Sequence, residues 1–235
     1  MVIYNPIQRS DWQEKMNPPM FYFLILVAPV LAILLVCLGL ETLNSNWFGW
    51  VLLLFGIGYV TGGLIYFWRS KGSVKKIQGE EKNDRSFWLI LPGFLTVFFG
   101  SPLEYLFWPG LLPRPVWMQV IGLALFLASL ALRFWARQAI RGMYTGHVQI
   151  QSDHRLVQEG PYRYIRHPGY SGFLLMSLGI AIGYSSLIGL ASIFILLLPG
   201  LAYRMKVEEK LLEHHFGDAY RRYASKTKRL VPGIW

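Results

Sequence analysis

The chain has 235 residues and a formal net charge of +10, yet only 15% of its residues are charged, 54% are hydrophobic, and its mean hydropathy is +0.36. Apolar stretches near 20 residues recur, which is typical of a polytopic membrane protein and leaves little chain for a separate soluble catalytic domain. The single cysteine, Cys37, excludes disulfides within the chain, cysteine-based zinc sites and a paired-thiol redox motif.

The apolar runs predict transmembrane helices in chain order. Four spans are expected, at about residues 20–40, 47–68, 87–99 and 116–136. From Tyr170 to Tyr203 the chain is apolar for longer than one crossing needs, and residues 183–186 interrupt this run, which predicts a tight helical hairpin. We therefore expect an all-α membrane protein with about six transmembrane helices, including this C-terminal hairpin, followed by a cytoplasmic amphipathic helical tail.

The basic residues predict the orientation in the membrane. With six spans, one side would hold 22 of the 23 lysines and arginines, in residues 1–19, 69–86, 133–169 and 204–235. Only Arg114 falls on the other side. Because lysine and arginine concentrate in cytoplasmic connections, we expect both termini to be cytoplasmic. This asymmetry and attraction to anionic lipid explain the net charge, so membrane lipids are expected partners and nucleic acid is not.

Residues 160–170, GPYRYIRHPGY, place Arg166, His167 and Tyr170 around a proline at the start of the hairpin. Proline is favoured in the first turn of a helix. The free backbone N–H groups of that turn, together with arginine, imidazole and phenol side chains, suit a ligand with carboxylate and hydroxyl groups. The same run would also serve as an interfacial anchor. Both interpretations place these residues at the cytoplasmic surface.

The tail is expected to begin as a continuation of the last span, from Arg204 to Phe216, with Gly217 as a left-handed cap. Helical spacing puts Glu208 on the apolar stripe and turns Glu209 and Glu213 toward the more exposed side. The spacing alone leaves open whether Glu208 and Glu209 are a solvated face at the membrane interface or part of a site.

A second short helix is expected next, with Asp218 as its cap. It carries Tyr220 and Tyr223 one turn apart, and Pro232 ends the regular structure.

Two motifs resemble the S-adenosylmethionine-binding signature of the isoprenylcysteine carboxyl methyltransferases and their phospholipid methyltransferase relatives. The first is 154–162, HRLVQEGPY, followed by 166–172, RHPGYSG; the second is Glu208-Glu209 followed by Leu212, Phe216-Gly217, Tyr220 and Tyr223. The resemblance covers about 137–232. It implies a division into residues 1–136, with about four transmembrane helices, and 137–235, a cofactor-binding methyltransferase region.

The resemblance implies an integral-membrane methyltransferase that uses S-adenosylmethionine and an amphiphilic lipid or isoprenoid-type acceptor, without a metal. The implied cofactor-binding residues are Leu156, Val157, Gly160, Pro161, Tyr162, His167, Tyr170, Glu208 and Glu209. The implied catalytic residues are Arg204, Glu208 and Arg166, of which the two arginines would orient an acceptor carboxylate.

Carboxyl O-methylation of an isoprenylcysteine-like or isoprenoid substrate is the favoured reaction. A carboxylate acceptor is already ionised and needs an arginine to aim it. An amine or thiol acceptor needs a base, for which Glu208 or His167 would serve. The alternatives are a phospholipid amine N-methyltransferase, an NADPH-dependent sterol-reductase-like membrane enzyme, and a non-catalytic membrane scaffold with a basic cytoplasmic face.

Overall fold

The structure is a computed structural model that describes residues 37–42, 46–58, 86–108, 112–140 and 156–234. Over these residues it is helical and has no β-strand; an isolated bridge joins Ile165 and Lys228. The expected all-α class is confirmed for this part of the chain. The chain forms two compact units, Met1–Glu41 with Gly49–Ser73, and Thr42–Phe48 with Val74–Trp235. The functional division at residue 136 stays a prediction.

The described part of the first unit is helical at residues 37–41 and at Gly49–Gly58. The second of these helices lies inside the second expected span. The rest of that span, and most of the first expected span, lie outside the described residues.

The third expected span is longer than the sequence indicated. Helix α5 (Ser86–Leu95) continues through the π-helical segment η2 (Thr96–Gly100) into α6 (Ser101–Phe107). The expected end near residue 99 is therefore wrong, and Trp88–Phe107 forms one apolar run of 20 residues. Pro102 is the second residue of α6, which directly follows the π-helical segment, and it does not end the run.

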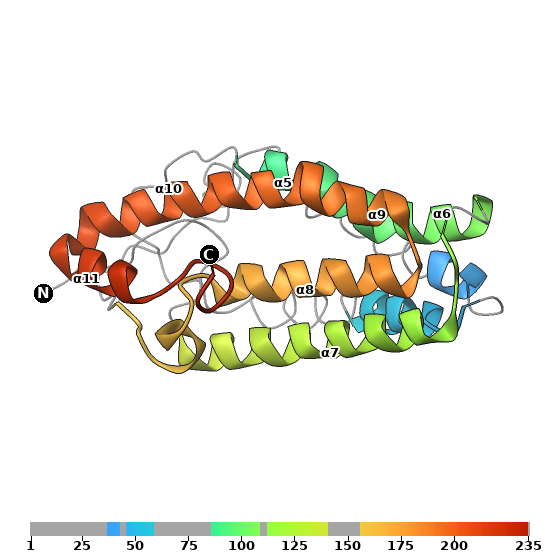
Figure 1. Cartoon of the computed structure of the whole chain (residues 1–235), viewed down its shortest axis with the longest axis horizontal. Helices are drawn as coiled ribbons and strands as arrows, with labels where there is room; N and C mark the ends of the chain where they lie inside the picture. Colours follow the sequence, from blue (N-terminus) through green and yellow to red (C-terminus); the bar gives the residue numbers. More distant parts are fainter. Residues whose placement is uncertain (1–36, 43–45, 59–85, 109–111, 141–155, 235) are drawn as a thin grey trace, which may run out of the picture. The chain divides into compact units, whose positions relative to one another are not determined.

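Helix α7 (Val116–Ala139) confirms the fourth expected span and extends it by one turn. It packs along α8 (Pro168–Gly183), and the two helices lie side by side (Figure 1). A Cβ atom on Gly122 would lie 2.6 Å from the Cα atom of Gly183 and 2.7 Å from the carbonyl oxygen of Gly179. Glycine at these positions therefore allows the two backbones to approach closely.

The predicted hairpin is present, with its turn at the expected place. After α8, residues 184–186 turn the chain into α9 (Leu187–Ser192), the π-helical η4 (Ile193–Leu197) and α10 (Leu198–Phe216). Ser186 caps α9 by accepting a 2.8 Å hydrogen bond from the Gly189 N–H. The two arms pack on different partners: α8 lies beside α7, whereas α10 runs beside α5 (Figure 1).

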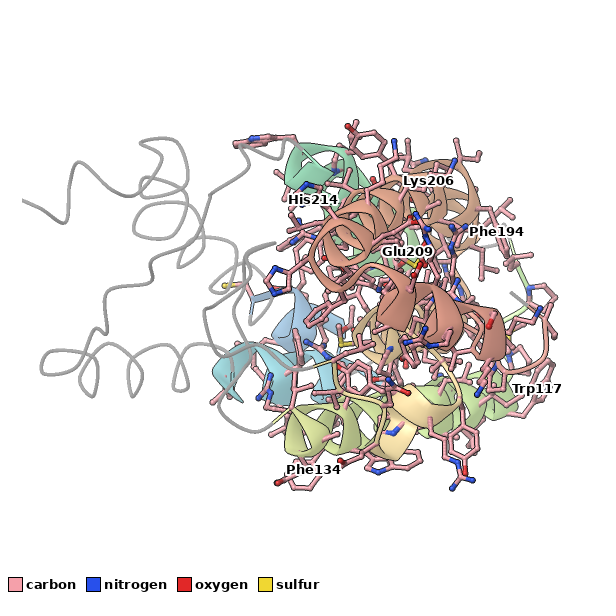
Figure 2. The ribbon with its side chains drawn as sticks, turned by 90° about the vertical axis from the view of Figure 1, so that its left-hand side faces the viewer. Trp117, Phe134, Phe194, Lys206, Glu209 and His214 are labelled. Carbon is pink, nitrogen blue, oxygen red and sulfur yellow. The ribbon has the colours of Figure 1, made fainter. Side chains whose placement is uncertain are left out.

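Among the described residues, three helices are long and apolar enough to cross a membrane: Trp88–Phe107, Val116–Ala139 and Leu187–Phe216. Pro168–Gly183 and Gly49–Gly58 are shorter apolar helices. Trp117, Phe134 and Phe194 are more than half exposed and lie at the edge of the bundle, as expected of lipid-facing side chains (Figure 2). The chain is thus a multi-pass membrane protein, while the count of six and the cytoplasmic termini stay predictions.

The tail folds as two helices. Gly217 ends α10 with the expected positive φ of 52°, although its ψ of −127° lies outside the left-handed helical region. The expectation that Asp218 caps the next helix is wrong. Asp218 is the first residue of α11 (Asp218–Lys226) and makes no capping hydrogen bond; its carboxylate instead pairs with Arg221 at 3.3 Å.

Candidate active site

The hairpin brings the two sequence motifs to one level. Residues 168–183 and 187–203 are 16 and 17 residues long, and at about 1.5 Å per helical residue they cover nearly equal rises on the two sides of the turn. His167, before the first arm, and Arg204, after the second, therefore lie level. In agreement, the Arg204 Nε atom donates to the Tyr170 hydroxyl at 2.6 Å.

Glu208 joins the two arms. Its carboxylate accepts a short hydrogen bond from the Tyr170 hydroxyl and lies 3.3 Å from the Arg204 Nε atom. Its other oxygen, Oε2, lies 3.5 Å from His167 Nδ1. Glu208 therefore contacts three of the residues that the sequence assigned to the site.

Glu209 is surrounded by cationic groups. Arg166 Nε donates to it at 3.0 Å, His167 Nε2 lies 3.3 Å away, and Arg229 contacts it with Nη2 at 2.6 Å and with Nε at 3.0 Å. The expectation that Glu209 faces the exposed side is wrong: its side chain is 14% exposed, against 21% for Glu208. The reason is that the tail folds back over it, so that Glu209 lies inside the bundle (Figure 2).

His167 lies between the two carboxylates, and its side chain is only 6% exposed. Burial alone lowers the pKa of His167, but hydrogen bonds and charge from Glu208 and then Glu209 outweigh it, so the net pKa is raised above its usual 6.5. Both ring nitrogens face an acceptor, which favours the doubly protonated imidazolium form. The ring also stacks on Tyr170, with ring centroids 5.6 Å apart.

The C-terminal segment completes the site, and sequence reasoning missed it. The backbone N–H groups of Arg166 and His167 donate to the carbonyl oxygens of Lys228 and Arg229 at 2.7 and 3.0 Å, and Ser171 Oγ donates to the Leu230 carbonyl at 2.7 Å. These bonds fix the position from which Arg229 reaches Glu209.

The guanidinium of Arg166 also forms hydrogen bonds with the tail. Its Nη1 atom donates to the carbonyl oxygens of Ala224, at 2.8 Å, and of Thr227. An acceptor carboxylate would have to compete with these bonds and with Glu209 for this guanidinium.

Of the remaining implied cofactor residues, residues 160–162 lie in a 3-10 helix that packs against α7. Gly160 has a φ of 60°, and a Cβ atom on it would lie 3.1 Å from that of Ala139, so glycine fits both the space and the backbone. Pro161 is buried in the 3-10 helix η3 (Gly160–Arg163). Leu156, Val157 and Tyr162 are half-buried. Their roles in cofactor binding stay predictions. Among the described residues, no three histidine, cysteine or acidic side chains are gathered as a metal ion would require.

Comparison with known proteins decides the family. The chain is 32% identical to protein-S-isoprenylcysteine O-methyltransferase B of Arabidopsis thaliana over 164 residues, which are 67% of this chain and 83% of the relative. This chain belongs to the isoprenylcysteine O-methyltransferase family. The human protein-S-isoprenylcysteine O-methyltransferase is 30% identical over 142 residues, 60% of this chain and 50% of that relative.

Two further matches agree with this family. The phospholipid methyltransferase family model matches residues 117–219, from the start of α7 into α11. A solved structure of the eukaryotic intramembrane Ras methyltransferase, an isoprenylcysteine carboxyl methyltransferase, has the same fold: its TM-score is 0.57 at 22% identity, covering 96% of this chain and 81% of that one. This member of the family is therefore an integral-membrane methyltransferase enzyme.

Proposed function

We propose that this enzyme transfers a methyl group from S-adenosylmethionine to the carboxylate of an amphiphilic acceptor, of the isoprenylcysteine or isoprenoid acid type. The relatives named above support the acceptor class. The observation that carries the proposal is His167 held between Glu208 and Glu209, in a cluster where three arginines face two glutamates. Such a cluster is built to bind charged groups at fixed positions.

The protonation of the cluster favours a carboxylate acceptor over an amine. Methylation of an amine needs a base that takes up its proton. His167 is poorly suited to this role because its raised pKa keeps it cationic at higher pH than an ordinary histidine. A carboxylate acceptor gives up no proton and needs only cationic groups that aim it, which the arginines supply.

The residues of the site fit an amino-acid-bearing methyl donor. When bound, S-adenosylmethionine supplies a methyl group on a positively charged sulfur, which an acceptor oxygen attacks in line. Glu208 is the more exposed of the two glutamates and suits an ammonium group. The ring face of Tyr170 suits a cation. The buried hydroxyl of Tyr220, which has no hydrogen-bond partner among the described residues, is a polar group that a ligand would satisfy.

We assign the acceptor carboxylate to Arg204. The run Leu187–Phe216 is about 45 Å long at 1.5 Å per residue, whereas the hydrocarbon core of a bilayer is about 30 Å thick. Arg204 is the first charged residue of this run, so it lies where the apolar part ends. An acceptor with its chain in the bilayer would present its carboxylate at this level. Arg166, in contrast, donates hydrogen bonds to carbonyl oxygens of the tail.

The proposed orientation places this end of the bundle at the cytoplasmic side, with the donor site within residues 137–235. The support is the distribution of 22 of the 23 basic residues. The orientation can be tested by placing a single cysteine at Lys226 or at Arg114 in a Cys37→Ser background. Each variant is then treated on intact cells with a thiol reagent that does not cross the membrane. Labelling at Lys226→Cys without labelling at Arg114→Cys would reverse the proposed orientation.

The deciding experiment is methyl transfer by the purified enzyme in lipid nanodiscs, with radiolabelled S-adenosylmethionine and either an N-acetylated prenylcysteine or phosphatidylethanolamine. We expect labelled prenylcysteine whose label is released by alkali, as from a methyl ester. The phospholipid methyltransferase match supports amine N-methylation as the second candidate. Alkali-stable label on phosphatidylethanolamine, with none on prenylcysteine, would establish that candidate instead.

Control variants distinguish a loss of activity at the site from a general effect of substitution on α10. Glu208→Gln should abolish transfer, while Glu213→Gln, on the same helix but with a side chain that is 45% exposed, should not. Binding of NADPH in preference to the methyl donor would favour the sterol-reductase-like alternative. The methyltransferase relatives argue against that result.

A further inference from the structure

Two side chains of the C-terminal region lie at the cluster without a complete set of partners. The phenol ring of Tyr220, on α11, is 4% exposed, and its hydroxyl has no hydrogen-bond partner among the described residues. A buried hydroxyl without a partner costs about 1–3 kcal/mol. The sequence motif contains Tyr220, but the spacing assigned it no role beyond a helical repeat.

Tyr220 lies close to the charges of the cluster. Burial raises its pKa, and beyond burial the charges of Glu209, Arg166 and Arg229 all act on it. Its ring meets that of Tyr223 edge to face, with centroids 6.2 Å apart. Tyr220 is therefore close enough to feel the charge of the carboxylate that Arg229 contacts.

Arg229 uses one edge of its guanidinium. Nε and Nη2 contact Glu209, whereas Nη1 has no hydrogen bond within the described part of the chain. Arg229 is also the most exposed of the three arginines, at 28% against 12% for Arg166 and 15% for Arg204. Its outer edge is thus the most accessible cationic donor of the cluster.

The charge of the cluster leaves room for an anion. Arg166, Arg204 and Arg229 carry three positive charges and Glu208 and Glu209 two negative ones, a surplus of one before His167 is counted. A planar guanidinium is well suited to a carboxylate. Figure 1 shows the C-terminal end of the chain beside the start of α8, and the His167 N–H donates to the carbonyl oxygen of Arg229 at 3.0 Å, so this anion site would adjoin His167.

We propose that Tyr220 and Arg229 bind the carboxylate of the methyl donor's amino-acid moiety, with the phenol and the outer edge of the guanidinium as hydrogen-bond donors. This inference rests on the proposed function. It assigns the two ends of the amino-acid moiety to different parts of the chain: the ammonium to Glu208 of α10, and the carboxylate to α11 and the segment that follows it.

The test compares two ligands on two proteins. S-adenosylmethionine and its decarboxylated analogue differ only in the carboxylate, and calorimetric titration of each into the full-length parent and into Arg229→Gln forms a double-mutant cycle. We expect the parent to bind S-adenosylmethionine at least tenfold more tightly than the analogue. Arg229→Gln should weaken S-adenosylmethionine more than tenfold and the analogue less than twofold. Arg222→Gln removes the same charge from an exposed position of α11 and should change neither affinity.

A second variant keeps the test decisive if Arg229→Gln folds poorly. Tyr220→Phe removes only the unpartnered hydroxyl. We expect it to weaken the binding of S-adenosylmethionine severalfold and to leave the binding of the analogue unaffected. Equal weakening of both ligands by either variant would overturn the inference, because it would mean that the residue only supports Glu209. A folded parent that binds neither ligand would overturn the proposed function as well, which distinguishes the two failures.

Discussion

Glutamates at the two ends of the hairpin show how the same side chain serves different purposes. Glu209, in the second half of α10, is contacted by Arg166, His167 and Arg229. Glu104, on α6 near the hairpin turn, is 2% exposed, and the donors to its side chain among the described residues are uncharged groups. Its oxygens accept the Ser186 hydroxyl, the Leu187 N–H at 3.0 Å and the Ile188 N–H at 2.9 Å.

The difference lies in what surrounds each carboxyl group. Glu104 satisfies backbone N–H groups that the first turn of α9 leaves without partners, so it acts as a cap supplied from another helix. The three donors that contact its side chain all find their acceptor there. Glu209 lies among more positive charge than it neutralises, at the end of the bundle that the C-terminal segment covers. The turn end therefore fixes the hairpin, and the charged end is suited to a ligand.

The largest expected effect on stability is at the turn end. Glu104→Ala would leave a hydroxyl and two N–H groups without their acceptor, and at about 1–3 kcal/mol for each buried unsatisfied group the total loss should reach about 3 kcal/mol or more. Thermal unfolding in detergent measures it. Glu104→Gln keeps one acceptor oxygen and should lose less. A folded Glu104→Ala protein with weakened affinity for S-adenosylmethionine but unchanged stability would contradict the structural role given to the turn end.

At the charged end the main effect should be on binding. Glu209→Gln would leave three cationic groups facing a neutral amide. We therefore expect the affinity for S-adenosylmethionine to fall more than tenfold, which is about 1.4 kcal/mol. Glu213→Gln, one turn later on the exposed side and paired with Arg221 at 2.8 Å, is the matched control and should change affinity less than twofold. Equal effects of the two variants would show that overall charge, and not the cluster, governs binding.

His167 should make stability depend on pH. Its pKa is raised in the folded protein above the unfolded value of 6.5, so its stabilising contribution is complete below pH 6.5 and is lost as pH rises through the folded-state pKa. The melting temperature of the parent should therefore fall above pH 6.5 more steeply than that of His167→Gln. Parallel profiles for the two proteins would mean that the imidazolium adds nothing to the fold.

The parts of this structure that the sequence predicted correctly depend on local signals. An apolar run of two helix lengths broken by Gly183 and polar residues predicts a hairpin, and Gly217 marks the end of α10. The end of the third span was predicted too early, since the sequence does not show that a π-helical segment carries the helix past Gly100 to Pro102.

The errors at the site arise from contacts between distant segments. The spacing of α10 turned Glu209 outward, because a single helix gives no sign that residues 227–230 will pair with 165–167 and cover it. Arg229 lies 20 residues after Glu209 and follows no helical repeat with it. Glu104 did leave a signal, an acidic residue within an apolar helix, which usually marks a buried partner or a functional site.

The smallest expected effect separates the two tyrosines of α11. The Tyr223 hydroxyl donates to the Tyr162 carbonyl at 2.8 Å, and burial raises the pKa of Tyr223 to about 12, so this donor is present throughout the neutral range. Tyr223→Phe should therefore cost about 1 kcal/mol. Tyr220→Phe removes the same atom from a hydroxyl without a partner among the described residues, so stability should be unchanged or rise. Melting temperatures of the two variants without ligand measure the difference. A larger loss for Tyr220→Phe would mean that its hydroxyl is already bonded in the free protein.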